Sequence, residues 1–91
     1  MLSQEPINLQ NVRKEDINKE ILRLGMIAEL DAVNLYEQLA AMTDSEKIKK
    51  VLLDIAREEK THVGEFETLL QEHDQEQVEE LKKGKEEVDE L

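Results

Sequence analysis

The sequence contains no cysteine and no tryptophan, and both absences limit what the chain can do. Without cysteine there are no disulfide bonds, no thiolate metal ligands and no thiol nucleophile. Tyr36 and Phe66 are the two aromatic residues, so a hydrophobic core has to be built mainly from aliphatic side chains. Internal repeats and Gly/Ser-rich linkers are absent as well. We therefore expect residues 1–91 to form one small domain.

Basic residues and long apolar runs are also scarce. The chain has 23 acidic and 12 basic residues, which gives a net charge of −11. Nucleic acids and anionic membranes both require a basic surface, so this charge argues against both as partners. No apolar run approaches the roughly 20 residues of a membrane span, and the N-terminus has no signal-peptide pattern. We therefore expect a cytoplasmic protein.

Hydrophobic residues recur at helical spacing along most of the chain, which predicts an all-α fold. Residues 1–10 are expected to form an irregular lead-in, and Asn11 is expected to cap a helix that ends near residue 42. Thr43 and Glu46 have the spacing of a capping box, so a second helix should start there and continue to about residue 72. The short connection makes these two helices an antiparallel hairpin.

A third helix is predicted over residues 75–91, because Asp74 and Gln77 repeat the capping-box spacing. Its apolar residues are sparse, and its many Glu and Lys residues are typical of a solvated helix face. We expect this helix to dock on a neighbour rather than to build the core. Gly25, inside the first helix, indicates that another helix approaches closely there.

Each long helix carries ionisable residues within an apolar stripe. The stripe of the first helix consists of Leu22, Met26, Glu29, Val33, Tyr36 and Ala40. The stripe of the second helix consists of Ile48, Leu52, Ile55, Glu59, His62, Phe66 and Leu69. Burying an unpaired carboxylate is costly, so the glutamates at these positions require a cationic partner or a metal ion.

These stripes are too wide for one hairpin to bury, and two hairpins together would make a four-helix bundle. Di-iron sites in such bundles take a Glu from each of two helices and a Glu-x-x-His from each of the other two. This chain supplies half of that set in Glu29, Glu59 and His62, so a symmetric dimer would complete it. Fe, Mn and Zn all suit these ligands, and iron is favoured because two bridged ions can each give one electron to oxygen. Tyr36 lies on the same stripe as Glu29 and is placed to hydrogen-bond a ligand or the bound oxygen.

Other interpretations of the same residues remain open. His62 can be a satisfied core histidine with Glu59 on the surface, and Glu58 is also at helical spacing from His62. His73, beside Asp74 at a predicted helix end, fits an ordinary surface histidine.

Two blocks of the sequence, residues 28–38 and residues 57–62, resemble the encapsulated ferritins. These are short relatives of ferritin that serve as cargo of encapsulin nanocompartments. The resemblance extends from about residue 16 to residue 91. Single-chain ferritins and rubrerythrins hold both halves of the metal site in one longer chain.

The resemblance implies a ferroxidase, which oxidises Fe(II) to Fe(III) with dioxygen at a di-iron site shared between two subunits. Glu29, Glu59 and His62 would be the ligands of two iron ions at each dimer interface. The dimers would assemble into a ring, typically a decamer, and the ferric product would be stored inside an encapsulin shell. Some members are fused to the shell protein, so the shell would be either the host or the rest of a longer polypeptide.

Three further positions are compared with the family's pattern. Asp31 matches an acidic position near the path by which metal reaches the site. Ala28 and Leu35 depart from the pattern, because the family has an acidic residue and an aromatic residue there.

Two other functions are carried as alternatives. The first is a rubrerythrin-like di-iron peroxidase, although the absence of cysteine argues against a built-in rubredoxin-type electron donor. The second is a non-enzymatic helical oligomerisation module, in which the polar residues of the stripes set the register of the dimer.

Overall fold

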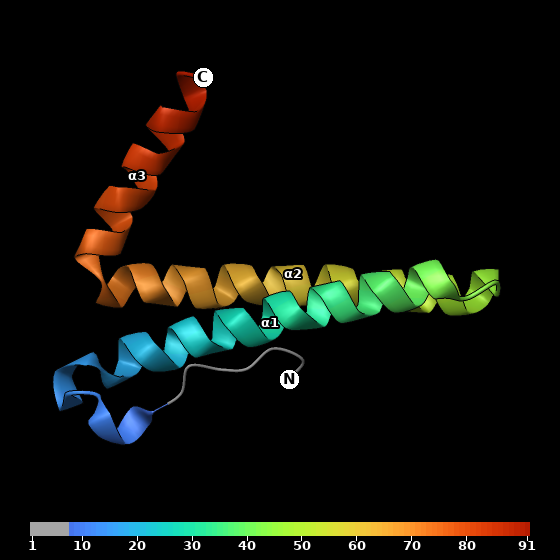
Figure 1. Ribbon diagram of the computed structural model, residues 1–91, viewed down its shortest axis with the longest axis horizontal. Coiled ribbons are helices and arrows are strands. Elements are labelled where there is room, and N and C mark those ends of the chain that lie inside the picture. The colour runs from blue at the N-terminus through green and yellow to red at the C-terminus, as the bar shows by residue number, and fades with distance from the viewer. Residues whose placement is uncertain (1–7) are drawn as a thin grey trace.

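The computed structural model describes residues 8–91, and these residues form helices joined by short connections (Figure 1). Three α-helices are present: α1 (Ile17–Met42), α2 (Glu46–His73) and α3 (Gln75–Asp89). Two short 3-10 turns, Leu9–Asn11 and Lys14–Asp16, precede α1. The predicted all-α fold, a helical hairpin followed by a C-terminal helix, is confirmed. Part of the predicted lead-in, residues 1–7, lies outside the described residues.

α1 and α2 lie side by side in antiparallel orientation and together form the hairpin (Figure 1). Each is roughly 40 Å long at 1.5 Å per residue. Among the described residues, the buried apolar side chains come from these two helices and are Leu22, Val33, Ala40, Ala56 and Leu70. Three of the five belong to the stripe predicted for the first helix, so that stripe faces α2 as expected.

Two of the three predicted helix caps are wrong, and only at α2 does another side chain make the capping hydrogen bond. Asp16 rather than Asn11 precedes α1, because residues 14–16 form a 3-10 turn that leads into the helix. Ser45 rather than Thr43 caps α2, and its hydroxyl accepts a hydrogen bond from the Ile48 backbone N–H at 3.3 Å. Thr43 is already engaged as the C-cap of α1, where its backbone N–H donates to the Leu39 carbonyl. The third cap, Asp74 at the start of α3, is confirmed.

The stripe predicted for the second helix divides into two faces. Ala56 and Leu70 are buried, and the residues at helical spacing between them, including Glu59 and Phe66, are half-buried. By contrast, Ile48 is 52% exposed and Leu69 is 45% exposed. These two belong to a series with seven-residue spacing, which we call the outer stripe and which consists of Ile48, Ile55, His62 and Leu69. The outer stripe therefore lies at the edge of the contact with α1, where Ile55 and His62 are half-buried and Ile48 and Leu69 are exposed.

α3 leaves the end of α2 at a steep angle and points away from the hairpin (Figure 1). Apart from Gln77 and Val78, which are half-buried, its residues are exposed. The expectation that this helix docks on a neighbour is therefore met only at its first turn within the chain. The radius of gyration is 16.3 Å, whereas a compact domain of this length has about 12 Å. One chain alone thus leaves much of its apolar surface uncovered.

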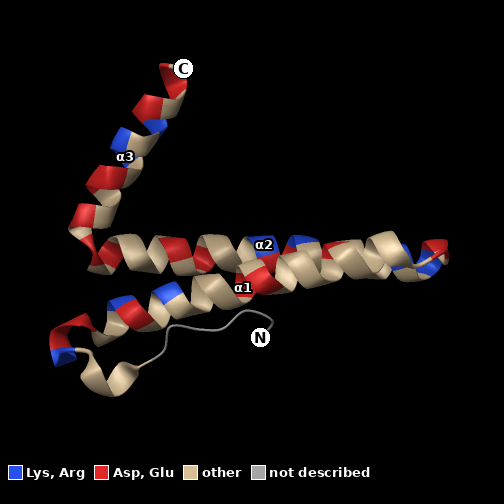
Figure 2. Ribbon diagram, viewed as in Figure 1, with Lys and Arg blue, Asp and Glu red and all other residues tan. Residues whose placement is uncertain are grey.

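Charged residues are distributed unevenly over the three helices. Figure 2 shows that α3 carries acidic and basic residues along its length, whereas the C-terminal half of α1 has few of either. No helix in the described part of the chain is both long and apolar enough to cross a membrane.

Candidate metal centre

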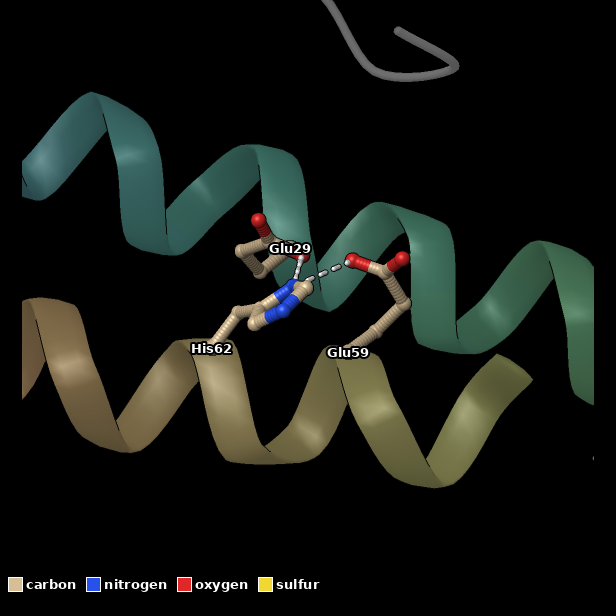
Figure 3. A group of neighbouring side chains, drawn as sticks. All are labelled: Glu29, Glu59 and His62. Atoms are coloured by element: carbon tan, nitrogen blue, oxygen red, sulfur yellow. Dashed lines mark hydrogen bonds and ion pairs between the residues drawn. The ribbon is translucent and has the colours of Figure 1, made fainter. Parts of the chain in front are cut away.

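Glu29 on α1 and the pair Glu59 and His62 on α2 point toward one another across the hairpin (Figure 3). One ligand atom from each of the three side chains can be chosen so that all lie within 4.8 Å of one another. Nδ1 of His62 is 3.3 Å from Oε2 of Glu59 and 3.5 Å from Oε2 of Glu29. The imidazole therefore lies between the two carboxylates, and the three residues form one cluster.

The helix geometry explains how this cluster forms. Residues three apart on a helix lie on the same face, which brings Glu59 and His62 together on α2. The antiparallel register places Glu29 of α1 opposite this pair. One helical turn away, Gly25 of α1 meets the ring of Phe66 of α2, so the two helices are in contact directly beside the cluster.

One oxygen of the cluster lacks a hydrogen bond. Oε2 of Glu29 is buried and accepts none, because its 3.5 Å approach to His62 does not have hydrogen-bond geometry. Leaving a buried acceptor unsatisfied costs about 1–3 kcal/mol. Two carboxylates also face a single imidazole, so their negative charges outnumber the one positive charge that the histidine can carry. Carboxylate oxygens and an imidazole nitrogen suit first-row divalent metal ions. The cluster therefore fits a metal cation, which would give the buried oxygen a partner.

The cluster is open on one side. The His62 side chain is 44% exposed, and His62 belongs to the outer stripe at the edge of the contact with α1. Within the single chain, His62 is therefore reachable from one side while its ring faces Glu29 and Glu59 on the other. Three donor atoms from one chain also leave coordination positions free on any metal ion bound here.

The remaining candidate residues lie outside the cluster. Asp31 and Tyr36 are half-buried on α1, and neither is among the three residues brought together. Glu58 is exposed, so the carboxylate beside His62 is that of Glu59. His73 is exposed at the end of α2, as its position in the sequence suggested.

Sequence reasoning placed Phe66 in the same stripe as His62 but did not pair it with Gly25. A usable signal was present, because Gly25 precedes Glu29 by four residues and Phe66 follows His62 by four. In an antiparallel hairpin that pairs Glu29 with His62, this spacing places the glycine opposite the ring.

Comparisons with known proteins give consistent results. The family model described as rubrerythrin matches residues 20–90. A ferritin-like–encapsulin shell fusion protein of Pyrococcus furiosus is 57% identical over 93 residues, which covers 100% of this chain and 27% of that protein. An encapsulin nanocompartment cargo protein of Myxococcus xanthus, EncC, is 40% identical over 57 residues, which covers 63% of this chain and 44% of that protein. The chain therefore spans less than half the length of either relative.

A solved structure is also similar. The crystal structure of the encapsulated ferritin domain from Pyrococcus furiosus matches with a TM-score of 0.85 and 56% sequence identity. The match covers 100% of this chain and 95% of that one. The likeness extends over the hairpin and α3 together.

Proposed function

Because the chain belongs to the rubrerythrin family and is an encapsulated ferritin domain within it, we propose that it is a ferroxidase. Its substrates are Fe(II) and dioxygen, and Glu29, Glu59 and His62 are the residues that bind iron. The observation that carries this proposal is the cluster itself, in which a buried Glu29 oxygen without a hydrogen bond faces Glu59 and His62.

The reaction requires two iron ions side by side. Each Fe(II) loses one electron, so one pair supplies the two electrons that reduce dioxygen to hydrogen peroxide with uptake of two protons. Two pairs supply the four electrons that reduce it to two waters with uptake of four protons. The carboxylates favour the more highly charged Fe(III) product because they place negative charge around it.

A second copy of the chain completes the site. One chain offers two carboxylates and one imidazole, and two copies offer the four carboxylates and two imidazoles of a di-iron centre in a four-helix bundle. The partly exposed outer stripe supports this arrangement, since it contains both His62 and apolar residues such as Leu69. Two outer stripes packed together would bury apolar surface and bring the two half-sites face to face. Further contacts would join the dimers into a ring, for which we propose a decamer.

Two residues outside the cluster receive supporting roles in this proposal. Tyr36 lies seven residues after Glu29 on the same face of α1 and would hydrogen-bond an iron ligand or the oxygen species. Asp31 would assist iron on its way to the site.

The names of the relatives indicate where the Fe(III) product would be stored. One relative is a fusion of a ferritin-like part with an encapsulin shell, and another is a cargo protein of an encapsulin nanocompartment. We propose that this domain works inside such a shell in the cytoplasm, as cargo or as part of a fusion, and that Fe(III) is stored in the lumen.

The rubrerythrin match also favours a second candidate, a di-iron peroxidase. In that case hydrogen peroxide rather than dioxygen would be the oxidant. The two functions are distinguished by adding Fe(II) to metal-free protein with either oxidant and recording the growth of ferric absorbance. Faster oxidation by dioxygen supports the ferroxidase, and oxidation by peroxide alone supports the peroxidase.

The site assignment is tested in the same assay with single variants. Glu29→Ala, Glu59→Ala and His62→Ala should each abolish rapid iron oxidation, and Glu58→Ala is the matched control because Glu58 is exposed outside the cluster. The wild-type protein should also change its mass in solution when iron is added. Unchanged oxidation in the three ligand variants would refute the assignment. A wild type without oxidation or assembly would favour a non-enzymatic oligomerisation module.

A further inference from the structure

Gly25 is located in the interior of α1, where glycine has no conformational purpose. No described glycine has a positive φ, so the backbone at Gly25 is one that any residue can adopt. Glycine in a helix interior costs roughly 1 kcal/mol relative to alanine. Space rather than backbone conformation must therefore explain this residue.

The ring of Phe66 occupies the space that a side chain at residue 25 would need. An ideal Cβ on Gly25 would lie 2.6 Å from Cε1 of Phe66 and 2.8 Å from both Cδ1 and Cζ. Such distances are far below the 3.5–4.0 Å of favourable carbon contacts. At Gly64 and Gly84 a Cβ would meet nothing within 4 Å. Among the three glycines, Gly25 is thus the one at which a side chain of the facing helix fills the space of a Cβ.

This contact lies one helical turn from the metal centre on both helices. Gly25 precedes Glu29 by four residues on α1, and Phe66 follows His62 by four on α2. Residues at this spacing are neighbours on one helix face. Any increase in the separation of the helices at Gly25 therefore moves Glu29 away from His62 and Glu59.

We propose that Gly25 is a positioning residue for the metal centre, and this inference rests on the proposed function. Because Gly25 has no side chain, the Phe66 ring can lie directly against α1. This contact sets the separation of the two helices, and therefore the distance between Glu29 on α1 and the pair Glu59 and His62 on α2. A methyl group there displaces the ring or the helix. Metal sites require their ligands within about 0.5 Å of the productive geometry, so a small displacement is enough to weaken binding.

The test measures cobalt binding to the metal-free protein, with Co(II) as a spectroscopic probe that does not depend on iron oxidation. Gly25→Ala should weaken Co(II) affinity about tenfold or more, the range found when groups that support metal ligands are changed. Gly64→Ala is the matched control, because it makes the same substitution in α2 at a position where the new Cβ meets nothing. Its Co(II) affinity should equal that of the wild type. Equal affinity in Gly25→Ala and the wild type would overturn the inference.

A second pair of variants separates positioning from a general loss of stability. In a Phe66→Leu background the ring is gone, so adding Gly25→Ala should leave Co(II) affinity the same as in Phe66→Leu alone. The comparison of Phe66→Leu with the double variant also tests the positioning role of Gly25 if Gly25→Ala by itself does not fold. A further loss of affinity in the double variant would overturn the inference, since the effect would then not pass through the ring. Failure of the wild type to bind Co(II) would instead refute the proposed metal site itself.

Discussion

Arg23 of α1 donates a hydrogen bond from Nη2 to Oδ2 of Asp74 at 2.9 Å. The other oxygen of Asp74 accepts from the backbone N–H of Gln77 at 3.1 Å and so caps α3. The Asp74 side chain is 9% exposed, and both of its oxygens are engaged. One carboxylate therefore starts α3 and anchors that start to α1, which fixes the point at which α3 leaves the hairpin.

Replacing Asp74 should separate these two tasks. Asp74→Asn keeps a good capping residue but removes the charge that Arg23 binds, whereas Asp74→Ala removes both interactions. We expect the melting temperature to fall in both variants, with the larger decrease in Asp74→Ala, and helical circular dichroism to decrease in Asp74→Ala. Thermal unfolding of metal-free protein measures both effects. Equal stability of Asp74→Asn and the wild type would show that the contact with Arg23 contributes nothing measurable.

The same carboxylate should make stability depend on pH. The hydrogen bond from the Gln77 backbone, together with Arg23 and the nearby Lys19, lowers the pKa of Asp74 below its ordinary value of 3.8. The hydrogen bond with Arg13 lowers the pKa of Asp16 in the same direction. A lowered folded-state pKa contributes stability above the unfolded value, and this contribution is lost as pH falls through the folded value.

The difference in stability between the wild type and Asp74→Asn isolates the contribution of Asp74 from that of other acids. We expect this difference to be constant at neutral pH and to shrink toward zero as the pH is lowered below about 4. Urea unfolding of metal-free protein at a series of pH values measures it. A difference that stays constant down to the lowest pH would contradict the assignment.

The Asp74 cap could be predicted from sequence and its partner Arg23 could not. A cap depends on residues within one helical turn, so Asp74 and Gln77 were sufficient to indicate it. Arg23 is 51 residues away, and its approach depends on how α1, α2 and α3 pack. The cap of α2 was missed for a local reason, since Thr43 ends α1 and leaves Ser45 to start the next helix.

The proximity of Glu29, Glu59 and His62 could be predicted from sequence, because helical periodicity places all three within apolar stripes of α1 and α2. Periodicity alone did not show that the stripe of α2 is divided. Residues at three- and four-residue steps drift around a helix, and only the packing against α1 determines which of them are covered. His62 therefore ended at the open edge, while Ala56, outside the predicted stripe, is buried.

The buried oxygen of Glu29 predicts a conflict between stability and metal binding. Glu29→Met replaces the carboxylate with an apolar side chain of similar length, which removes a buried acceptor without a hydrogen bond. We expect the free energy of unfolding of the metal-free protein to rise by about 1 kcal/mol, because that acceptor no longer has to be desolvated. Stabilisation by added Co(II) should be lost in the same variant. Urea unfolding with and without Co(II) measures both, and Glu58→Met serves as the surface control. A less stable metal-free Glu29→Met protein would show that the carboxylate supports the fold without metal.

If the outer stripe forms the dimer interface, a substitution in it should remove activity without changing any metal ligand. Leu69 follows His62 by seven residues on this stripe and is 45% exposed in the single chain. Leu69→Glu should oppose dimerisation, because the interface would have to bury a charge next to its copy from the second subunit. A cost of about 3 kcal/mol would weaken association roughly a hundredfold. Iron oxidation should fall with the fraction of dimer, as measured by mass in solution.

Leu53→Glu is the matched control for this substitution, because Leu53 is 42% exposed on α2 but lies outside the outer stripe. It introduces the same charge on the same helix, so the dimer and its rapid iron oxidation should both persist. Raising the concentration of Leu69→Glu should restore dimer and activity together, since its Glu29, Glu59 and His62 are intact. A Leu69→Glu protein that oxidises iron rapidly as a monomer would refute the shared site, because one half-site would then be sufficient.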